Sequence, residues 1–212
     1  MVRLQFSVEL NYDIAPPGGD FIFNIHAART PQQTEVAKFW SQTSVNGYTQ
    51  VLRTQITGAS RPIAARVHDV ALFHEVTTDA QIAIYASKYK YLRWRPITAL
   101  RTDDGNPATP YDPTFTSLLA TPAHPEYPSG HAGYAGAAET VLASLFGSRP
   151  KVPFTITSSA LPGTYRNYDA WSTLTQENVD ARVWSGIHLR STDVASVAFG
   201  RAIAAEALKE AS

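Results

Sequence analysis

The chain has 212 residues, of which 44% are hydrophobic and 17% are charged, a composition typical of a globular protein. Its 18 basic and 18 acidic residues give a formal net charge of zero, so no overall field favours nucleic acid as a partner. The absence of cysteine excludes a disulfide framework, a zinc–thiolate site and a cysteine nucleophile. No apolar run approaches the roughly 20 residues that span a bilayer, so we expect no membrane span.

The N-terminal part predicts extended chain followed by a helix. Residues 1–29 alternate in places and contain a Pro-Pro-Gly-Gly turn, and they lack the apolar stretch of a signal peptide. The compartment therefore stays open between a cytoplasmic protein and an exported one whose signal precedes this sequence. A helix is expected from Thr30, because threonine caps helices, Pro31 suits the first position and Gln33 completes a capping box.

The remainder predicts an all-α bundle with long loops at one end. Residues 61–100 are expected to form two consecutive helices, the second capped at Thr77 or Thr78. Residues 101–128 are proline-rich and predict a long loop. Further helices are predicted over residues 129–146, 169–186 and 192–210. We expect residues 30–212 to form one helical-bundle domain, the C-terminal portion of a longer protein.

Two cations stand near the end of the long helical stretch. Lys88 and Arg95 are seven residues apart, which is about two helical turns, so both side chains are expected on one face. Together they could bind two oxygens of one anion, the arginine through its planar fork and the lysine as a point charge. The alternative is a basic surface stripe, because residues 88–101 also contain other basic residues and no acid.

A second segment, Ser129-Gly130-His131, is predicted to open a helix. Ser129 suits the N-cap, and the Gly130 amide is one of the unpaired amides of a helix start, where negative charge is favoured. His131 would then lie beside a bound oxyanion. The alternative is an ordinary helix cap followed by a surface histidine.

The third segment contains Arg182 and His188. Six residues do not place two side chains on one face of a straight helix. Gly186 lies between them and is expected to end the helix, so that both residues could point inward. The alternative is an unrelated surface arginine and a core histidine.

Together the three segments resemble the signature of the acid phosphatase and vanadium-dependent haloperoxidase superfamily: Lys-x6-Arg-Pro, Pro-Ser-Gly-His and Ser-Arg-x5-His-x3-Asp. The first two blocks match completely. The third departs from the pattern, because Ala181 replaces the serine and Thr192 occupies the Asp position, with Asp193 one residue later. The surrounding sequence is most similar to the chloroperoxidase-like bacterial branch, in residues 30–40, 94–99, 124–132 and 186–190.

The resemblance implies a helical bundle of this superfamily, with its long loops at the active-site end, that uses vanadate as cofactor. His188 would be the metal ligand, and His131 would move protons when hydrogen peroxide binds. The oxygens of vanadate, or of phosphate at the same place, would be held by Lys88, Arg95, Ser129, Gly130 and Arg182. Peroxide and halide would be the substrates, the organic acceptor is open, and a homo-oligomer is possible.

Two residues bear on halide choice. His124 stands seven residues before His131, where, in the family, bromoperoxidases carry a histidine and chloroperoxidases an aromatic hydrocarbon. The resemblance therefore favours bromide or iodide over chloride, with an unspecific loop histidine as the alternative. Trp94 stands next to Arg95 and could shape a halide pocket, with core packing as the alternative.

Two rival functions remain open at this point. The same groups would serve an acid phosphatase, with His188 as the nucleophile that forms a phosphohistidine and His131 as the acid for the leaving group. The departures at Ala181 and Thr192 also leave open an inactive bundle that binds vanadate or phosphate without turnover.

Overall fold

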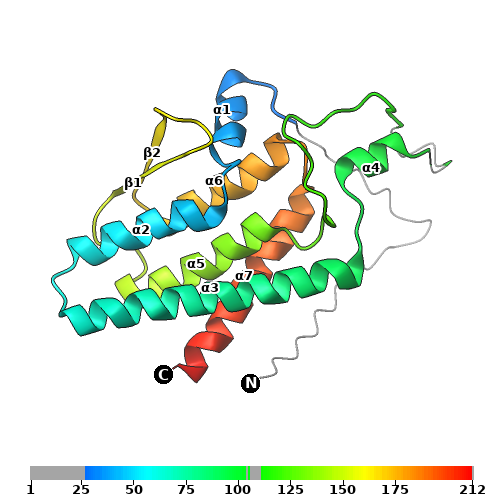
Figure 1. The fold of residues 1–212 in the computed structure, drawn as a ribbon. Helices are drawn as coiled ribbons and strands as arrows, with labels where there is room; N and C mark the ends of the chain where they lie inside the picture. The colour runs from blue at the N-terminus through cyan, green and yellow to red at the C-terminus, as the bar shows by residue number, and fades with distance from the viewer. Residues whose placement is uncertain (1–26, 104, 106–110, 212) are drawn as a thin grey trace.

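The structure is a computed structural model that describes residues 27–103, 105 and 111–211, and it is predominantly helical (Figure 1). Most of the extended segment predicted for residues 1–29 lies outside the described residues. The helices are α1 Pro31–Phe39, α2 Ser44–Gly58, α3 Ile63–Tyr91, α4 Pro96–Arg101, α5 Gly130–Phe146, α6 Trp171–Trp184 and α7 Arg190–Glu210. The strands β1 Phe154–Thr157 and β2 Tyr165–Tyr168 form an antiparallel hairpin that pairs Phe154 with Tyr168.

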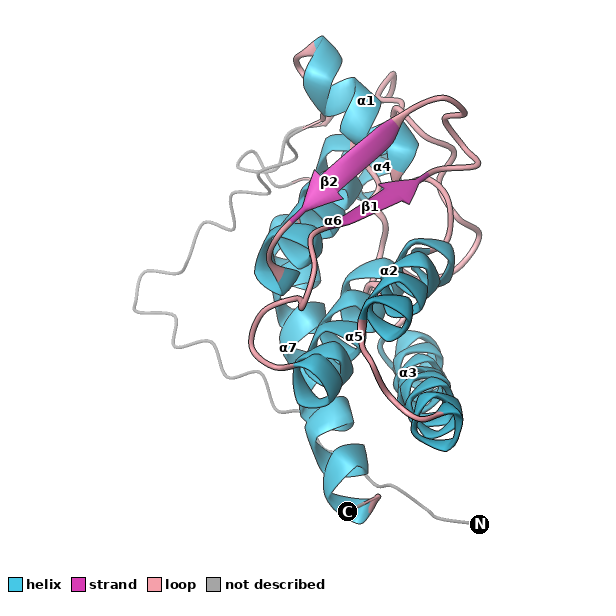
Figure 2. Cartoon of the chain, turned by 90° about the vertical axis from the view of Figure 1, so that its left-hand side faces the viewer, coloured by secondary structure: helices cyan, strands magenta, loops and turns pink. Residues whose placement is uncertain are grey.

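Helix α5 is the centre of the bundle and contacts α2, α3, α6 and α7. Its small, fully buried residues Ala135, Ala137 and Ala138 let these neighbours approach closely. The hairpin covers one side of the bundle beside α2 and α6 (Figure 2). The predicted all-α bundle is therefore confirmed, with the short hairpin as an addition.

Glycines set the distance between α5 and α7. A Cβ on Gly136 would lie 2.2 Å from the Val197 carbonyl oxygen, and a Cβ on Gly200 would lie 1.9 Å from the Gly133 carbonyl oxygen. The two backbones therefore meet directly, which only glycine allows. This contact brings the first residues of α5 against the first turns of α7, where the Ser129 amide donates to the Ser196 hydroxyl at 2.7 Å.

Helix α3 is continuous, so the predicted division at Thr77 or Thr78 is wrong. Thr77 is buried, and its hydroxyl donates to the Phe73 carbonyl 2.8 Å away, as a threonine inside a helix does. The helix ends at Tyr91, and Leu92 follows in the left-handed conformation with φ 48°. By contrast, the Thr30 cap of α1 is confirmed, because its hydroxyl accepts the Gln33 amide at 3.2 Å.

The outer face of α3 carries exposed apolar residues among polar ones. Phe73 and Ile84 are buried, whereas Val67 and Ile82 on the outer side are each 63% exposed. Exposed apolar surface of this kind often marks an interaction surface. In the described part of the chain, no helix is long and apolar enough to cross a membrane.

Candidate functional site

A pocket of about 330 Å³ lies where α5 begins and α6 ends, and we call it the anion pocket. Arg95, His124, Gly130, His131, Arg182 and His188 are among the residues that line it. Lys88 and Ser129 are fully buried. Burial lowers the pKa of both His131 and His188, and the positive charge of Lys88 adds to this effect. The structure thus brings together all three segments singled out in the sequence. Trp94 is not among the lining residues and is 55% exposed.

Arg95 reaches the pocket because the chain turns after α3. Arg95 is the N-cap residue of α4, so it does not share a helix face with Lys88 as predicted. Its guanidinium donates to the carbonyls of His124 at 3.0 Å and Ile187 at 2.9 Å. It also lies 2.9 Å from His188 Nε2 and 3.1 Å from His124 Nδ1. The two cations therefore converge through the left-handed turn at Leu92.

The other two cations are buried against backbone carbonyls. Lys88 Nζ donates to the Pro125 carbonyl at 2.8 Å and the Glu126 carbonyl at 3.3 Å. Burial, with the neighbouring charge of Arg95, lowers the pKa of Lys88 to about 7. Arg182 donates to the Trp40 carbonyl at 2.8 Å, and burial lowers its pKa to about 10. The Nε of Arg182 is buried without a hydrogen-bond partner among the described residues.

The carboxyl groups near these three cations, Glu126 and Asp193, act on them only from beyond ion-pair distance. Among the described residues, none of Lys88, Arg95 and Arg182 lies within ion-pair distance of a carboxylate. A buried charge without a partner is costly, so the pocket favours a bound anion. The part of the chain that the structure describes holds no group of three or more His, Cys, Asp or Glu side chains suited to a bare metal ion. An oxyanion such as vanadate or phosphate fits this donor set.

The start of α5 adds neutral donors. Ser129 is the N-cap, as predicted, and its hydroxyl accepts the Ala132 amide at 3.4 Å. The Gly130 amide has no hydrogen-bond partner among the described residues, as is usual for the first amide of a helix. A Cβ on Gly130 would meet nothing closer than the Tyr85 hydroxyl at 3.9 Å. The positive end of the helix therefore faces a pocket that the backbone leaves open.

The hydrogen bonds of His131 define which nitrogen is protonated. Its Nε2 lies 2.9 Å from the Gln42 carbonyl oxygen, which can only accept, so Nε2 carries the hydrogen. The pKa of His131 lies well below its usual value because of burial and the charge of Arg182. The ring is therefore neutral near pH 7, with an unprotonated Nδ1 that has no partner among the described residues.

His188 follows the turn that ends α6. Gly186 adopts φ 74° after the helix, which confirms that it interrupts the helix and lets His188 point inward. His188 Nδ1 lies 2.9 Å from Glu126 Oε1, and Arg95, which can only donate, faces Nε2. Nδ1 is thus the protonated nitrogen, and the lone pair of Nε2 faces the cations.

Glu126 is the site residue that the sequence analysis did not single out. It lies between His124 and Ser129, and its side chain is fully buried. Thr192, at the Asp position of the motif, donates its hydroxyl to Glu126 Oε2 at 2.7 Å. Asp193 has no hydrogen bond to His188 and so does not replace the missing aspartate. The sequence did offer one sign of this role, because Glu126 is an acidic residue within segment 124–132, which resembles the family.

His124 lies at the mouth of the site, partly exposed. Its ring meets the Tyr85 ring edge-on, with the centroids 5.7 Å apart, and its Nδ1 accepts from Arg95. Burial lowers the pKa of His124 below its usual value. The ring therefore presents a polar, mainly neutral edge to the pocket near pH 7.

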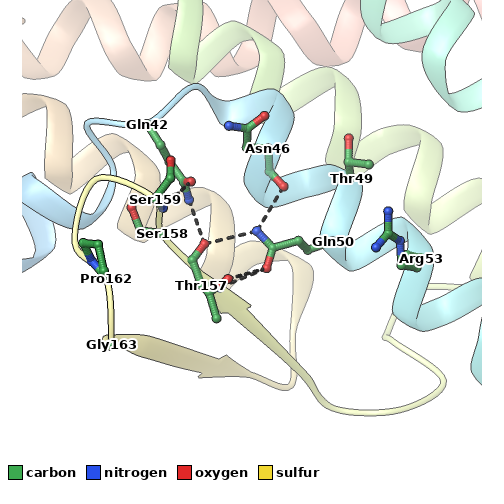
Figure 3. Close-up of a pocket in the computed structure, with 10 residues that line it drawn as sticks. All are labelled: Gln42, Asn46, Thr49, Gln50, Arg53, Thr157, Ser158, Ser159, Pro162 and Gly163. Atoms are coloured by element: carbon green, nitrogen blue, oxygen red, sulfur yellow. Dashed lines mark hydrogen bonds between the residues drawn. The ribbon is translucent and has the colours of Figure 1, made fainter.

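A larger hollow of about 550 Å³ lies beside β1 and α2, and we call it the hairpin pocket (Figure 3). Gln50 bonds the backbone on both sides of its amide, with Oε1 accepting the Thr157 amide at 3.0 Å and Nε2 donating to the Thr157 carbonyl at 3.1 Å. Gln42 also donates to that carbonyl, at 3.0 Å. These polar groups hold the hairpin against α2 and the segment just before it, and nothing in their chemistry indicates a reaction.

The fold and the pocket together define a helical bundle with a buried oxyanion site. The family model of the VCPO second helical-bundle domain matches residues 69–212, and the chain belongs to this family, within the vanadium haloperoxidase superfamily. No curated protein matches the chain by sequence.

Solved structures of similar fold agree with this assignment. A bacterial vanadium-dependent iodoperoxidase matches with a TM-score of 0.73 and 23% identity, over 84% of this chain and 43% of that protein. The apo and holo forms of a bacterial vanadium-dependent chloroperoxidase match with TM-scores of 0.70 and 0.67, each with 18% identity, over 87% of this chain and 45% of that one. This chain thus spans less than half the length of these proteins.

Proposed function

We propose that this chain forms the vanadate-binding part of a haloperoxidase that oxidises halide with hydrogen peroxide. The observation that carries the proposal is the set of three buried cations that have no ion-pair partner in the described part of the chain. One of them, Arg95, donates to the unprotonated Nε2 of His188. Family membership adds support for vanadate over other oxyanions. We further propose that residues 30–212 act as one catalytic domain, which the packing of α1 on α6 supports.

The roles of the residues follow from their bonding. Nε2 of His188 would bond the metal, and Lys88, Arg95 and Arg182 would donate to the anion's oxygens and spread their charge. The Ser129 hydroxyl and the Gly130 amide would add neutral donors at the helix start. When bound, vanadate supplies a Lewis acid that activates peroxide toward attack by halide.

His131 is suited to proton transfer. Its Nε2–H is bonded to the Gln42 carbonyl, which holds the ring in place, and its unprotonated Nδ1 can accept a proton as peroxide enters. A ring whose pKa lies well below the usual value gives that proton up again readily. His131→Ala is therefore expected to slow turnover more than it weakens vanadate binding.

Bromide is the favoured halide over chloride in this proposal, because His124 presents a polar edge where an aromatic hydrocarbon would favour chloride. The test is His124→Phe, with the rates of peroxide-dependent bromide and chloride oxidation measured on the same preparation. The ratio of bromide to chloride rates should fall in the variant. An unchanged ratio would remove His124 from the account of halide choice.

An acid phosphatase remains the second candidate, because phosphate shares the shape and charge of vanadate and an unprotonated Nε2 of His188 is also a nucleophile. The inactive binder is weakened by one observation. The hypothesis of an inactive binder rested on the departures from the family motif around Arg182 and His188. Glu126, however, supplies a carboxylate to His188 in place of the motif's missing aspartate.

Reconstitution distinguishes the three functions. Protein loaded with orthovanadate is assayed for peroxide-dependent bromination, and vanadate-free protein is assayed on a simple phosphate monoester. Bromination that disappears in His188→Ala and with excess phosphate is the expected result. Phosphatase activity inhibited by vanadate, without halide oxidation, would transfer the assignment to the phosphatase, and neither activity would favour the inactive binder.

A further inference from the structure

We propose that Glu126 is the positioning carboxylate of His188, and that it replaces the aspartate that the family motif places four residues after this histidine. At that position the chain has Thr192, and the carboxylate comes instead from the loop before α5. The inference rests on the proposed function only in taking His188 as the residue that bonds the anion.

Three donors converge on the Glu126 carboxylate. Oε1 accepts from His188 Nδ1 at 2.9 Å and from the Leu189 amide at 3.0 Å, and Oε2 accepts from the Thr192 hydroxyl at 2.7 Å. Its side chain is fully buried, so these bonds are not shared with solvent. Both oxygens are thereby held, and the carboxylate has one orientation toward the imidazole.

This orientation determines what His188 can do. A carboxylate accepts the Nδ1 hydrogen, which leaves the Nε2 lone pair directed at the anion and raises its strength as a ligand or nucleophile. Arg95, as a donor at 2.9 Å from Nε2, favours the same tautomer from the opposite side of the ring. Glu126 thus prepares the nitrogen that the proposed function uses.

The same residue also connects His188 to the cations. The backbone carbonyls of Pro125 and Glu126 accept from Lys88, and the carbonyl of His124 accepts from Arg95. The short loop 124–126 therefore holds two of the three cations with its backbone and the histidine with a side chain. Because one loop bonds all of them, the positions of His188, Lys88 and Arg95 are fixed relative to one another.

Asp193 is the nearest alternative in the sequence, and its surroundings exclude it from this role. Both of its oxygens are buried without a hydrogen-bond partner of good geometry among the described residues. Burial raises the pKa of Asp193 to about 8, with the nearby Ser129 hydroxyl acting in the opposite direction. Asp193 therefore provides a matched control, a buried carboxyl one residue from Thr192 that does not bond the imidazole.

The first test reads the tautomer of His188 directly in anion-free protein, by the ¹⁵N chemical shifts of its ring nitrogens. The native protein and Asp193→Asn should show one tautomer, protonated at Nδ1, and Glu126→Ala should show a mixture. Glu126→Ala/Thr192→Asp should restore the single tautomer, because it returns a carboxylate to the motif position. A native tautomer in Glu126→Ala, or no recovery in the double variant, would overturn the proposal.

The second test measures orthovanadate affinity in the same variants. Glu126→Ala should bind about 10- to 100-fold more weakly, with partial recovery in the double variant. Glu126→Gln keeps the shape of the side chain and an acceptor oxygen, so this variant should keep His188 protonated at Nδ1. Its orthovanadate affinity should still fall about tenfold, because the negative charge is lost. This variant also serves as the test if Glu126→Ala does not fold. Undiminished affinity in Glu126→Gln would contradict the role. If the tautomer responds as expected but halide oxidation is absent, the proposed function fails and the positioning role stands.

Discussion

The anion pocket and the hairpin pocket are both polar, but they differ in what their polar groups are bonded to. In the hairpin pocket Gln42 and Gln50 bond the backbone of β1, and the one arginine that lines the pocket, Arg53, is exposed to solvent (Figure 3). In the anion pocket Arg182 Nε and the Gly130 amide have no hydrogen-bond partner in the described part of the chain, and the buried cations form no ion pair there. The polar groups of the hairpin pocket therefore serve to hold the hairpin in place, and the smaller anion pocket is the candidate functional site. Unused buried charge indicates function better than volume does.

The largest difference between the pockets should appear when each loses an arginine. Arg182→Met should weaken phosphate and vanadate binding by about 100-fold or more, because it removes charge-assisted bonds from a buried site. Arg53→Met, an exposed residue of the hairpin pocket, should change the affinity less than twofold, within the error of the control. Isothermal titration measures both variants. Equal losses would remove the distinction between the pockets.

Anion binding should weaken as pH rises through about 7. Lys88 has its pKa lowered to about 7, so above this pH its amine is neutral in the anion-free protein. A bound anion favours the charged form, so binding above pH 7 takes up a proton, and the affinity should fall by up to about tenfold per pH unit. Sulfate is the probe, because its own charge does not change in this range.

The control for this pH dependence is Lys88→Arg, which stays charged throughout the range. Its sulfate affinity should lack the fall centred near pH 7 and should weaken only at higher pH, where the buried carboxyl of Asp193, whose pKa is raised to about 8, ionises beside the site. A native profile as flat as that of the variant would show that Lys88 does not control the binding.

A smaller effect is expected when the close contact between helices α5 and α7, next to the anion pocket, is widened. Gly200→Ala places a methyl group against the Gly133 carbonyl and should lower the free energy of unfolding by about 1–3 kcal/mol. Anion affinity should fall severalfold with it, because Ser129 is held against α7. Ala202→Ser, on the exposed side of the same helix, is the control in urea unfolding. Loss of stability at unchanged affinity would separate the helix contact from the site.

The smallest effect belongs to the hairpin pocket itself. Gln50→Ala removes the side-chain bonds to Thr157 and should lower the free energy of unfolding by about 1 kcal/mol. Phosphate affinity should not change. A clear loss of phosphate binding in this variant would mean that the hairpin contributes to the anion site.

Local signals in the sequence predicted local structure well. The caps at Thr30 and Ser129 and the end of α6 before Gly186 were predicted, because each depends on residues within a few positions. The division of α3 was predicted wrongly, because Thr77 resembles a cap in sequence but is enclosed by tertiary packing. The apolar residues of this helix do not all face the core, because Val67 and Ile82 lie on its exposed side. Periodicity alone does not show which apolar face is buried.

For the site, the sequence supplied the residue types and the structure supplied the geometry. Lys88 and Arg95 do lie together, but through the turn at Leu92 and not through a shared helix face. Glu126 could not be assigned from local patterns, because its partner His188 is 62 residues away in the chain. Trp94 could have shaped a halide pocket or packed in the core, yet its position on the turn leaves it exposed.

A crystal structure of the protein grown with orthovanadate tests the central claim most directly. We expect vanadium bonded to His188 Nε2, with Lys88, Arg95 and Arg182 donating to the vanadate oxygens and Glu126 still bonded to Nδ1. Vanadate bound in the hairpin pocket, or an anion pocket that stays empty at saturating vanadate, would contradict it.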